Sequence, residues 1–302
     1  MIKASHLTKR HASSTAVDDV SFTALPGSVT GLVGPNGAGK STTMKMIVGL
    51  VEPTSGSITV DGHRYARYEA PLTEIGALLD ANQVHPSRRA RDHLRIMAAT
   101  HGISSRRVDD VIEQVGLDGV AGKRFRTFSL GMKQRLGIAV ALLGDPHTLV
   151  LDEPTNGLDQ DGVHWVRHLC VSLASEGRAV LLSTHAMNEL EKTADHIVVM
   201  GKGRILVDAP MKDVLKQGGT ERIRARTDDL RALERVVMHS GGSMVSTAAD
   251  VAEITGLTIE QIAHAAKQSD LLIYELASMP VTLERAVFNA TADAVEFRGR
   301  DN

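Results

Sequence analysis

The chain contains 302 residues, which is enough for one large domain or for two unequal domains with a buried core. Its 34 Lys and Arg residues nearly balance its 36 Asp and Glu residues, so no basic excess points to nucleic acid as the main partner. The single cysteine, Cys170, cannot form an internal disulfide and indicates a reducing compartment. Apolar runs such as 138–143 are shorter than the roughly 18 residues of a membrane span. We therefore expect a cytoplasmic protein without a signal peptide.

Short strands alternate with helices through the first two thirds of the chain. The strands are expected at 2–8, 16–24, 28–34, 56–63, 147–154, 178–185, 196–200 and 204–208. The helices are expected at 40–50, 90–102, 104–116, 129–144, 161–177 and 187–194. This alternation predicts an α/β fold with a parallel core sheet, and the all-helical stretch at about 87–146 predicts a separate helical subdomain.

The last third of the chain has a different pattern. QGGT at 217–220 is a plausible linker, so we expect one domain at 1–217 and a small α+β domain at 220–302. The expected elements in this second domain are strand 222–227, helix 228–241, strands 243–247 and 250–256, helix 258–268, strand 271–277 and a last helix at 282–292. Thr258 and Gln261 fit a capping box. The order β-α-β-β-α-β predicts the split βαβ, or ferredoxin-like, arrangement.

A glycine-rich segment between a strand and a helix fits the pattern G-x-x-x-x-G-K-[ST] of a phosphate-binding loop. Its residues are Gly34, Pro35, Asn36, Gly37, Ala38, Gly39, Lys40, Ser41 and the adjoining Thr42. The glycines let backbone N–H groups turn toward phosphate oxygens, and the helix that follows adds its positive end. Lys40 supplies a charge for the β- and γ-phosphates, and the Ser41 hydroxyl can bind Mg²⁺. The alternative is a glycine turn that occurs by chance and binds no phosphate. The position of the segment between a strand and a helix disfavours this alternative.

Three polar residues follow two apolar strands. Asp152 and Glu153 come at the end of LVLDEP, and His185 ends RAVLLSTH. Ligands gather at the carboxyl ends of parallel strands. Beside a phosphate loop, Asp152 is expected to hold the magnesium ion, Glu153 to polarise the attacking water, and His185 to contact the γ-phosphate. The alternative is that these three residues are solvated polar residues at strand ends without a role in binding or catalysis.

These segments and two further motifs make the chain resemble the nucleotide-binding subunit of an ABC transporter over about residues 1–217. The matching motifs are Walker A at 34–42, the signature FSLGMKQR at 128–135, Walker B at 149–154, the D-loop NGLD at 156–159 and the switch histidine in STH at 183–185. The resemblance implies a P-loop NTPase cassette that has an N-terminal β subdomain and uses ATP and Mg²⁺ as cofactors.

The resemblance also implies that two ATPase subunits pair head to tail, as a homodimer or with a second ATPase chain. The Ser129 hydroxyl and the amides at the start of its helix make an anion site. By resemblance, Ser129 and Gly131 cover the γ-phosphate of an ATP held by the other chain. Asp159 of the D-loop is likewise expected among the nucleotide-binding residues.

Four positions in three motifs depart from the family pattern. His11 stands where a tyrosine usually stacks on adenine, and an imidazole is a smaller surface. Leu130 and Met132 occupy signature positions where a glycine and a glutamine are commonest. Asp80 stands where a glutamine normally senses magnesium, with Gln83 three residues later, and which of the two serves is left open.

The signature and the short C-terminal extension suggest bacterial exporters of drugs, bacteriocin-like peptides or lipids. In such a system a separate transmembrane permease supplies the pathway, and the ATPase is peripheral on the inner face of the cell membrane. The basic stretch at 87–91 is either a solvated face or a docking surface for that permease. A soluble ABC ATPase acting on ribosomes or DNA is the alternative, but the chain has one cassette and no heptads. A GTPase or small-molecule kinase is a weaker alternative, because the guanine-recognition motif N/T-K-x-D does not occur in the sequence.

Overall fold

The computed structural model describes all residues except 13, 218–221, 280–281 and 292–302. The chain divides into two compact units: Met1–Met211, with which the described residues 290–291 are grouped, and Lys212–Asn289. The division falls at the start of helix α8 (Met211–Gln217), close to the predicted linker. Residues 218–220 of that linker lie outside the described part of the chain.

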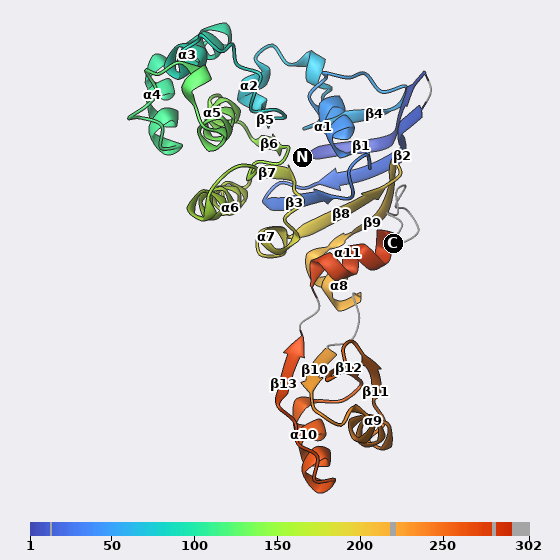
Figure 1. The fold of residues 1–302 in the computed structure, drawn as a ribbon. Coiled ribbons are helices and arrows are strands. Elements are labelled where there is room, and N and C mark those ends of the chain that lie inside the picture. The colour runs from blue at the N-terminus through green and yellow to red at the C-terminus, as the bar shows by residue number, and fades with distance from the viewer. Residues whose placement is uncertain (13, 218–221, 280–281, 292–302) are drawn as a thin grey trace. The chain divides into compact units, whose positions relative to one another are not determined.

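The first unit contains two sheets and the helices that surround them (Figure 1). Its strands are β1 (Ile2–His11), β2 (Ser14–Ala24), β3 (Ser28–Val33), β4 (Ser55–Val60), β5 (Ile75–Leu78), β6 (Thr148–Leu151), β7 (Ala179–Ser183), β8 (His196–Gly201) and β9 (Arg204–Pro210). Its helices are α1 (Lys40–Ile47), α2 (Pro71–Glu74), α3 (Ala90–Thr100), α4 (Ser105–Gln114), α5 (Leu130–Leu142), α6 (Gln160–Ser175) and α7 (Met187–Glu191), with 3-10 turns η1 (Tyr65–Arg67) and η2 (Phe125–Thr127).

The larger sheet has the strand order β5-β6-β7-β3-β8-β9, and only β9 runs antiparallel to its neighbour. Strand β7 therefore lies between β3 and β6. The register pairs Leu32 with Ser183 and Leu151 with Leu182, so all three strands end at nearly the same level. Because parallel strands bring their carboxyl ends to one edge, the segments that follow β3, β6 and β7 meet there.

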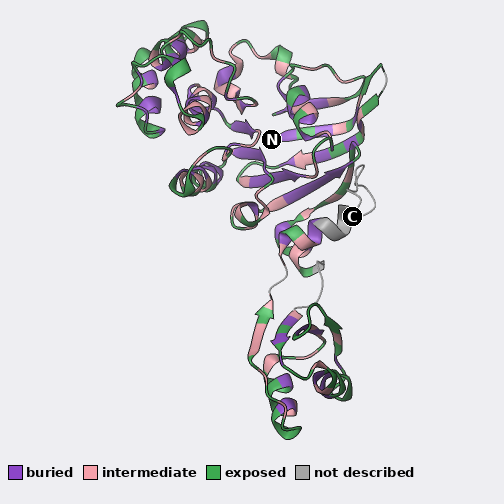
Figure 2. Ribbon diagram, in the orientation of Figure 1, coloured by how far each residue is buried: buried purple, intermediate pink, exposed green. Residues whose placement is uncertain are grey.

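The smaller sheet, in the order β2-β1-β4, is antiparallel and packs on the larger one through a shared apolar core. Figure 2 shows the central strands as buried, with exposure concentrated on the outer helices. Strand β5 has no counterpart among the predicted strands, because four residues give too short a pattern for a periodicity argument. The predicted parallel core sheet, β subdomain and helical segment are otherwise confirmed.

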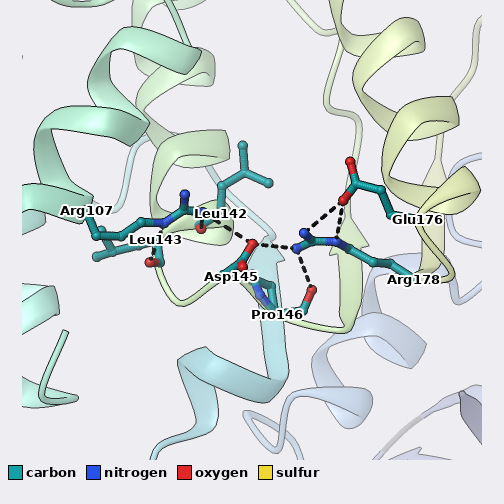
Figure 3. Close-up of polar contacts among 7 residues, drawn as sticks. All are labelled: Arg107, Leu142, Leu143, Asp145, Pro146, Glu176 and Arg178. Atoms are coloured by element: carbon teal, nitrogen blue, oxygen red, sulfur yellow. Dashed lines mark hydrogen bonds and ion pairs between the residues drawn. The ribbon is translucent and has the colours of Figure 1, made fainter. Parts of the chain in front are cut away.

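An ion-pair network ties the end of α5 to the strands that follow it (Figure 3). Arg107 of α4 donates to the carbonyl oxygens of Leu142 and Leu143, at the end of α5, at 2.7 and 3.3 Å. Arg178, just before β7, bonds Asp145 at 2.8 Å and Glu176 at 2.9 Å. Burial alone would raise the pKa of Asp145, but Arg178 and then Arg107 hold it below its ordinary value. The network thus fixes the loop that leads into β6.

The second unit is a four-stranded antiparallel sheet with helices. Its elements are α8 from Lys212 on, β10 (Arg222–Arg226), α9 (Leu230–His239), β11 (Ser243–Ser246), β12 (Val251–Thr255), α10 (Ile259–Gln268), β13 (Glu275–Met279) and α11 (Leu283–Thr291) up to Asn289. The strand order β11-β12-β10-β13 confirms the split βαβ arrangement. The capping box of Thr258 and Gln261 is also present. Strand β13 starts later than predicted because the N–H of Leu271 bonds Ala266 and closes α10.

Candidate nucleotide-binding site

The segment between β3 and α1 is a loop that glycine alone can form at two of its positions. Gly34 has φ 150° and Gly39 has φ 100°. A Cβ atom on Gly34 would lie 2.2 Å from the carbonyl oxygen of Met200, and one on Gly39 would lie 2.5 Å from that of Ala16. Any larger residue would therefore collide with backbone atoms, so the loop lies tightly against its neighbours.

Lys40 is the first residue of α1, and its side chain is folded back into the loop. Its Nζ atom donates to the carbonyl oxygens of Gly34 and Pro35 at 2.7 and 3.2 Å. Burial lowers the pKa of Lys40, while the nearby carboxylates of Glu153 and Asp152 act against that shift. The ammonium group thus lies between the loop and two carboxylates, where it can attract a phosphate.

One pocket of about 400 Å³ unites the phosphate loop with the end of β6. It is lined by Ala16, Asn36, Gly37, Ala38, Gly39, Lys40, Ser41, Thr42, Leu79, Asp152 and Glu153. Ala16 and Leu79 were not predicted from the sequence. They come from β2 and from the residue after β5, and neither carries a side-chain signal of polar chemistry.

Ser183, the last residue of β7, organises both carboxylate residues. Its hydroxyl donates to Asp152 Oδ1 at 2.5 Å and accepts the backbone N–H of Glu153 at 3.0 Å. Asp152 also donates its own N–H to the carbonyl of Leu78 at 2.7 Å. A hydroxyl that is both donor and acceptor can bridge two groups in this way. The turn after β6 is therefore anchored to the strands on both sides.

Glu153 and His185 form a direct contact at the edge of the sheet. The Nδ1 atom of His185 lies 2.7 Å from Oε2 of Glu153. The histidine side chain is 75% exposed, whereas that of Glu153 is 29% exposed. The structure thus joins the predicted histidine to the pocket through the glutamate, although His185 itself is not among the lining residues.

Four other predicted residues lie away from this pocket. Ser129 caps α5, with its Oγ accepting the N–H of Met132 at 3.2 Å, and Asp159 caps α6 by accepting that of Gly162 at 2.9 Å. Gly131 lies against the D-loop, because a Cβ atom there would be 3.1 Å from the carbonyl of Gly157. His11 is exposed at the end of β1. None of these described residues lines the pocket.

The alternative between Asp80 and Gln83 stays open in the structure. Both residues are exposed in the segment after β5, and neither lines the pocket. Asp80 Oδ1 accepts the N–H of Asn82 at 2.8 Å, which makes a local turn. Asn82 in turn accepts a hydrogen bond from Lys133 of α5 at 3.3 Å. This segment is thereby linked to the signature helix.

Two residues that contact the pair Asp152 and Glu153 were missed by the sequence argument. They are Ser183, which is fully buried, and Gln134, which is 5% exposed in α5 and donates to the Glu153 carbonyl at 2.6 Å. Ser183 is the one polar residue of β7, and Gln134 is the one polar residue among the buried residues of α5. A buried polar side chain must find a partner. That mismatch is the signal that could have marked both.

The donor set of the pocket fits a nucleotide with a magnesium ion. Asp152 and the Ser41 hydroxyl offer the hard oxygen ligands that Mg²⁺ prefers when it shares a site with phosphates. The N-terminus of α1 and Lys40 offer the complementary charge for the phosphates. The residues present therefore suit a magnesium–nucleotide complex.

Comparison with known proteins agrees with this geometry. Residues 17–156 match the family described as ABC transporter. The lantibiotic transport ATP-binding protein SrtF of Streptococcus pyogenes is 38% identical over 69% of this chain and 90% of that protein. The bacitracin transport ATP-binding protein BcrA of Bacillus licheniformis is 40% identical over 72% of each. The chain belongs to the ABC transporter family. It is an ATP-binding subunit and an ATPase.

A solved structure supports the same assignment. The structure titled as an ATP binding subunit of an ABC transporter aligns with a TM-score of 0.66 and 29% identity, over 72% of this chain and 92% of that one. In this ATPase the phosphate loop follows β3 and the Walker B motif includes β6, and both strands belong to one sheet. Among the described residues, no helix is both long and apolar enough to cross a bilayer.

Proposed function

We propose that this ATPase binds MgATP in the pocket between the phosphate loop and β6. Lys40 and the amides of the loop hold the phosphates, and Ser41 and Asp152 hold the magnesium ion, which neutralises charge on the phosphates. Glu153 polarises the attacking water, and His185 contacts the γ-phosphate. The observation that supports these roles is the convergence of Lys40, Ser41, Asp152 and Glu153 on one pocket, with His185 bonded to the glutamate.

We further propose that the site is completed by a second ATPase subunit. The helix α5 begins at the Ser129 cap, and its amides form an anion site, yet none of the described signature residues 128–135 lines the chain's own pocket. A second subunit paired head to tail supplies this helix end to the γ-phosphate. ATP then bridges two subunits, and hydrolysis releases them. His11 is proposed to face the adenine, and Asp159 the opposed subunit.

The work of this cycle is proposed to drive export through a separate transmembrane permease. The relatives named above are the ATP-binding proteins of lantibiotic and bacitracin transport. By that likeness, the proposed cargo is a drug, a bacteriocin-like peptide or a lipid. The ATPase would be peripheral on the inner face of the cell membrane, with the basic stretch 87–91 as a candidate contact with the permease.

Glu153→Gln tests the two-subunit proposal. The amide cannot accept a proton from water, so ATP should persist and hold the two subunits together. Size-exclusion chromatography with saturating MgATP should show a dimer for this variant and a monomer without nucleotide. The double variant Glu153→Gln with Ser129→Arg is the control, because a bulky cation at the cap blocks the helix end. A Glu153→Gln protein that stays monomeric in MgATP would contradict the proposal.

The membrane partner can be identified directly. The tagged full-length ATPase should copurify from detergent-solubilised membranes with an integral membrane protein, and the identity of that protein would narrow the cargo. Vesicles containing both proteins should then hydrolyse ATP faster when the cargo is present. Copurification with ribosomes in place of a membrane protein would contradict the transport role.

A further inference from the structure

Gln134 connects the signature helix to the catalytic edge of the same chain. It lies in the second turn of α5 and is 5% exposed. Its Nε2 atom donates a 2.6 Å hydrogen bond to the backbone carbonyl oxygen of Glu153. The other buried residues of this helix are apolar, namely Leu136, Ile138, Ala139, Ala141 and Leu142. A buried amide among apolar residues is unfavourable unless its hydrogen bonds are made. The contact with Glu153 therefore explains how a glutamine is accommodated at this position.

Glu153 has a backbone conformation that needs such support. Its φ angle is 49°, in the left-handed region that residues with a Cβ atom rarely adopt. Strained residues of this kind persist only where the surroundings hold them in place. Here the N–H is held by the Ser183 hydroxyl at 3.0 Å. The carbonyl is held by Gln134 and by the N–H of Asn156 at 3.1 Å.

The backbone of Glu153 determines where its carboxylate points. In the observed conformation the carboxylate both lines the pocket and contacts His185 at 2.7 Å. A return of φ to the ordinary negative range would swing the side chain away from both. Ser183 restrains the residue from β7, and Gln134 restrains it from α5. Gln134 thus connects the signature helix α5 to Glu153 of the same chain by a hydrogen bond.

We propose that Gln134 is a positioning residue for ATP hydrolysis, which holds the left-handed backbone of Glu153 so that the carboxylate faces the attacking water. The inference rests on the proposed role of Glu153. It assigns no contact between Gln134 and the nucleotide. The affinity for ATP should therefore be independent of this residue, while the rate of the chemical step should depend on it.

The first test is Gln134→Met, which keeps the length of the side chain and removes the donor. We expect kcat to fall on the order of ten- to a hundredfold, as for a small misplacement of a catalytic group, with KM for ATP unchanged. Gln134→Glu, which cannot donate when ionised, should lose at least as much. Gln114→Met, at an exposed glutamine of α4, is the matched control and should keep the wild-type rate. Thermal unfolding of each full-length variant identifies any that fail to fold.

The second test is a double-mutant cycle with Glu153→Gln. If Gln134 acts through the glutamate, Gln134→Met should have almost no further effect on single-turnover hydrolysis once the carboxylate is gone. An equal loss in both backgrounds would show a general structural role and overturn the proposal. A folded Gln134→Met or Gln134→Glu protein with wild-type kcat would overturn it and leave the role of Glu153 intact. Wild-type turnover by Glu153→Gln alone would overturn both.

Discussion

The Nδ1 atom of His185 lies 2.7 Å from Oε2 of Glu153, across the edge where β6 and β7 end. The two residues come from different strands, and each follows an apolar run that buries the strand in the sheet. Because the histidine is largely exposed, the contact does little for packing. It joins His185 to Glu153, which lines the pocket where the γ-phosphate is proposed to bind.

The histidine contact predicts a catalytic defect without a stability defect. His185→Ala should lower kcat on the order of a hundredfold, as expected for a lost polar contact to a transition state, and should change the midpoint of thermal unfolding very little. Steady-state ATPase assays and calorimetry would check both. His164→Ala, at an exposed position of α6, is the control. A His185→Ala protein with the wild-type kcat would exclude the proposed γ-phosphate contact.

Lys40→Met should separate nucleotide binding from stability. Burial already lowers the pKa of this lysine, so its charge is costly in the folded state, and replacing it should not lower the melting temperature. The rise in melting temperature on adding MgATP should be largely lost, with an affinity at least about tenfold weaker. Lys45→Met, one turn further along α1 and exposed, should retain the shift. An unchanged ATP-induced shift in Lys40→Met would contradict the assigned role.

Two glycines of the phosphate loop should differ in their tolerance of a methyl group. Gly34→Ala would place Cβ against the Met200 carbonyl, so we expect a loss of about 3 kcal/mol or more in unfolding free energy. Gly37 has φ 82° but no atom within 4 Å of the added Cβ, so Gly37→Ala should cost only about 1 kcal/mol of backbone strain. Denaturant titration would rank the two variants, and equal losses would show that the contact with Met200 is unimportant.

The network around Asp145 predicts a specific dependence of stability on pH. Its folded pKa lies below 3.8, so its contribution is fully present above about pH 5 and is lost as the pH falls through the folded pKa. Asp145→Asn should lower the unfolding free energy by about 1 kcal/mol or less at pH 7, because the carboxylate is exposed and screened. Denaturant titrations of both proteins should converge below about pH 3. A constant difference across this range would rule out the ion pairs as its source.

Local patterns in the sequence were sufficient for most of the helices and strands, though not for α2 and β5, and for the glycine-rich loop between β3 and α1. A glycine-rich turn needs particular residues at fixed spacing, and an amphipathic or apolar period is set by near neighbours along the chain. The alternation of strands and helices, the split βαβ order and the capping box at Thr258 follow from such short-range rules, and the structure confirms them. The ABC family assignment followed from the same motifs.

Only the tertiary structure decided which distant residues meet. The contacts of Ser183 with Asp152 and of Gln134 with Glu153 depend on β7 lying beside β6 and on α5 packing near their edge. The order of the strands depends on the long connections between them and on burial across the whole sheet. A local sequence pattern contains neither kind of information. The left-handed backbone of Glu153 is likewise a consequence of its surroundings, because nothing in the side chain itself favours that conformation.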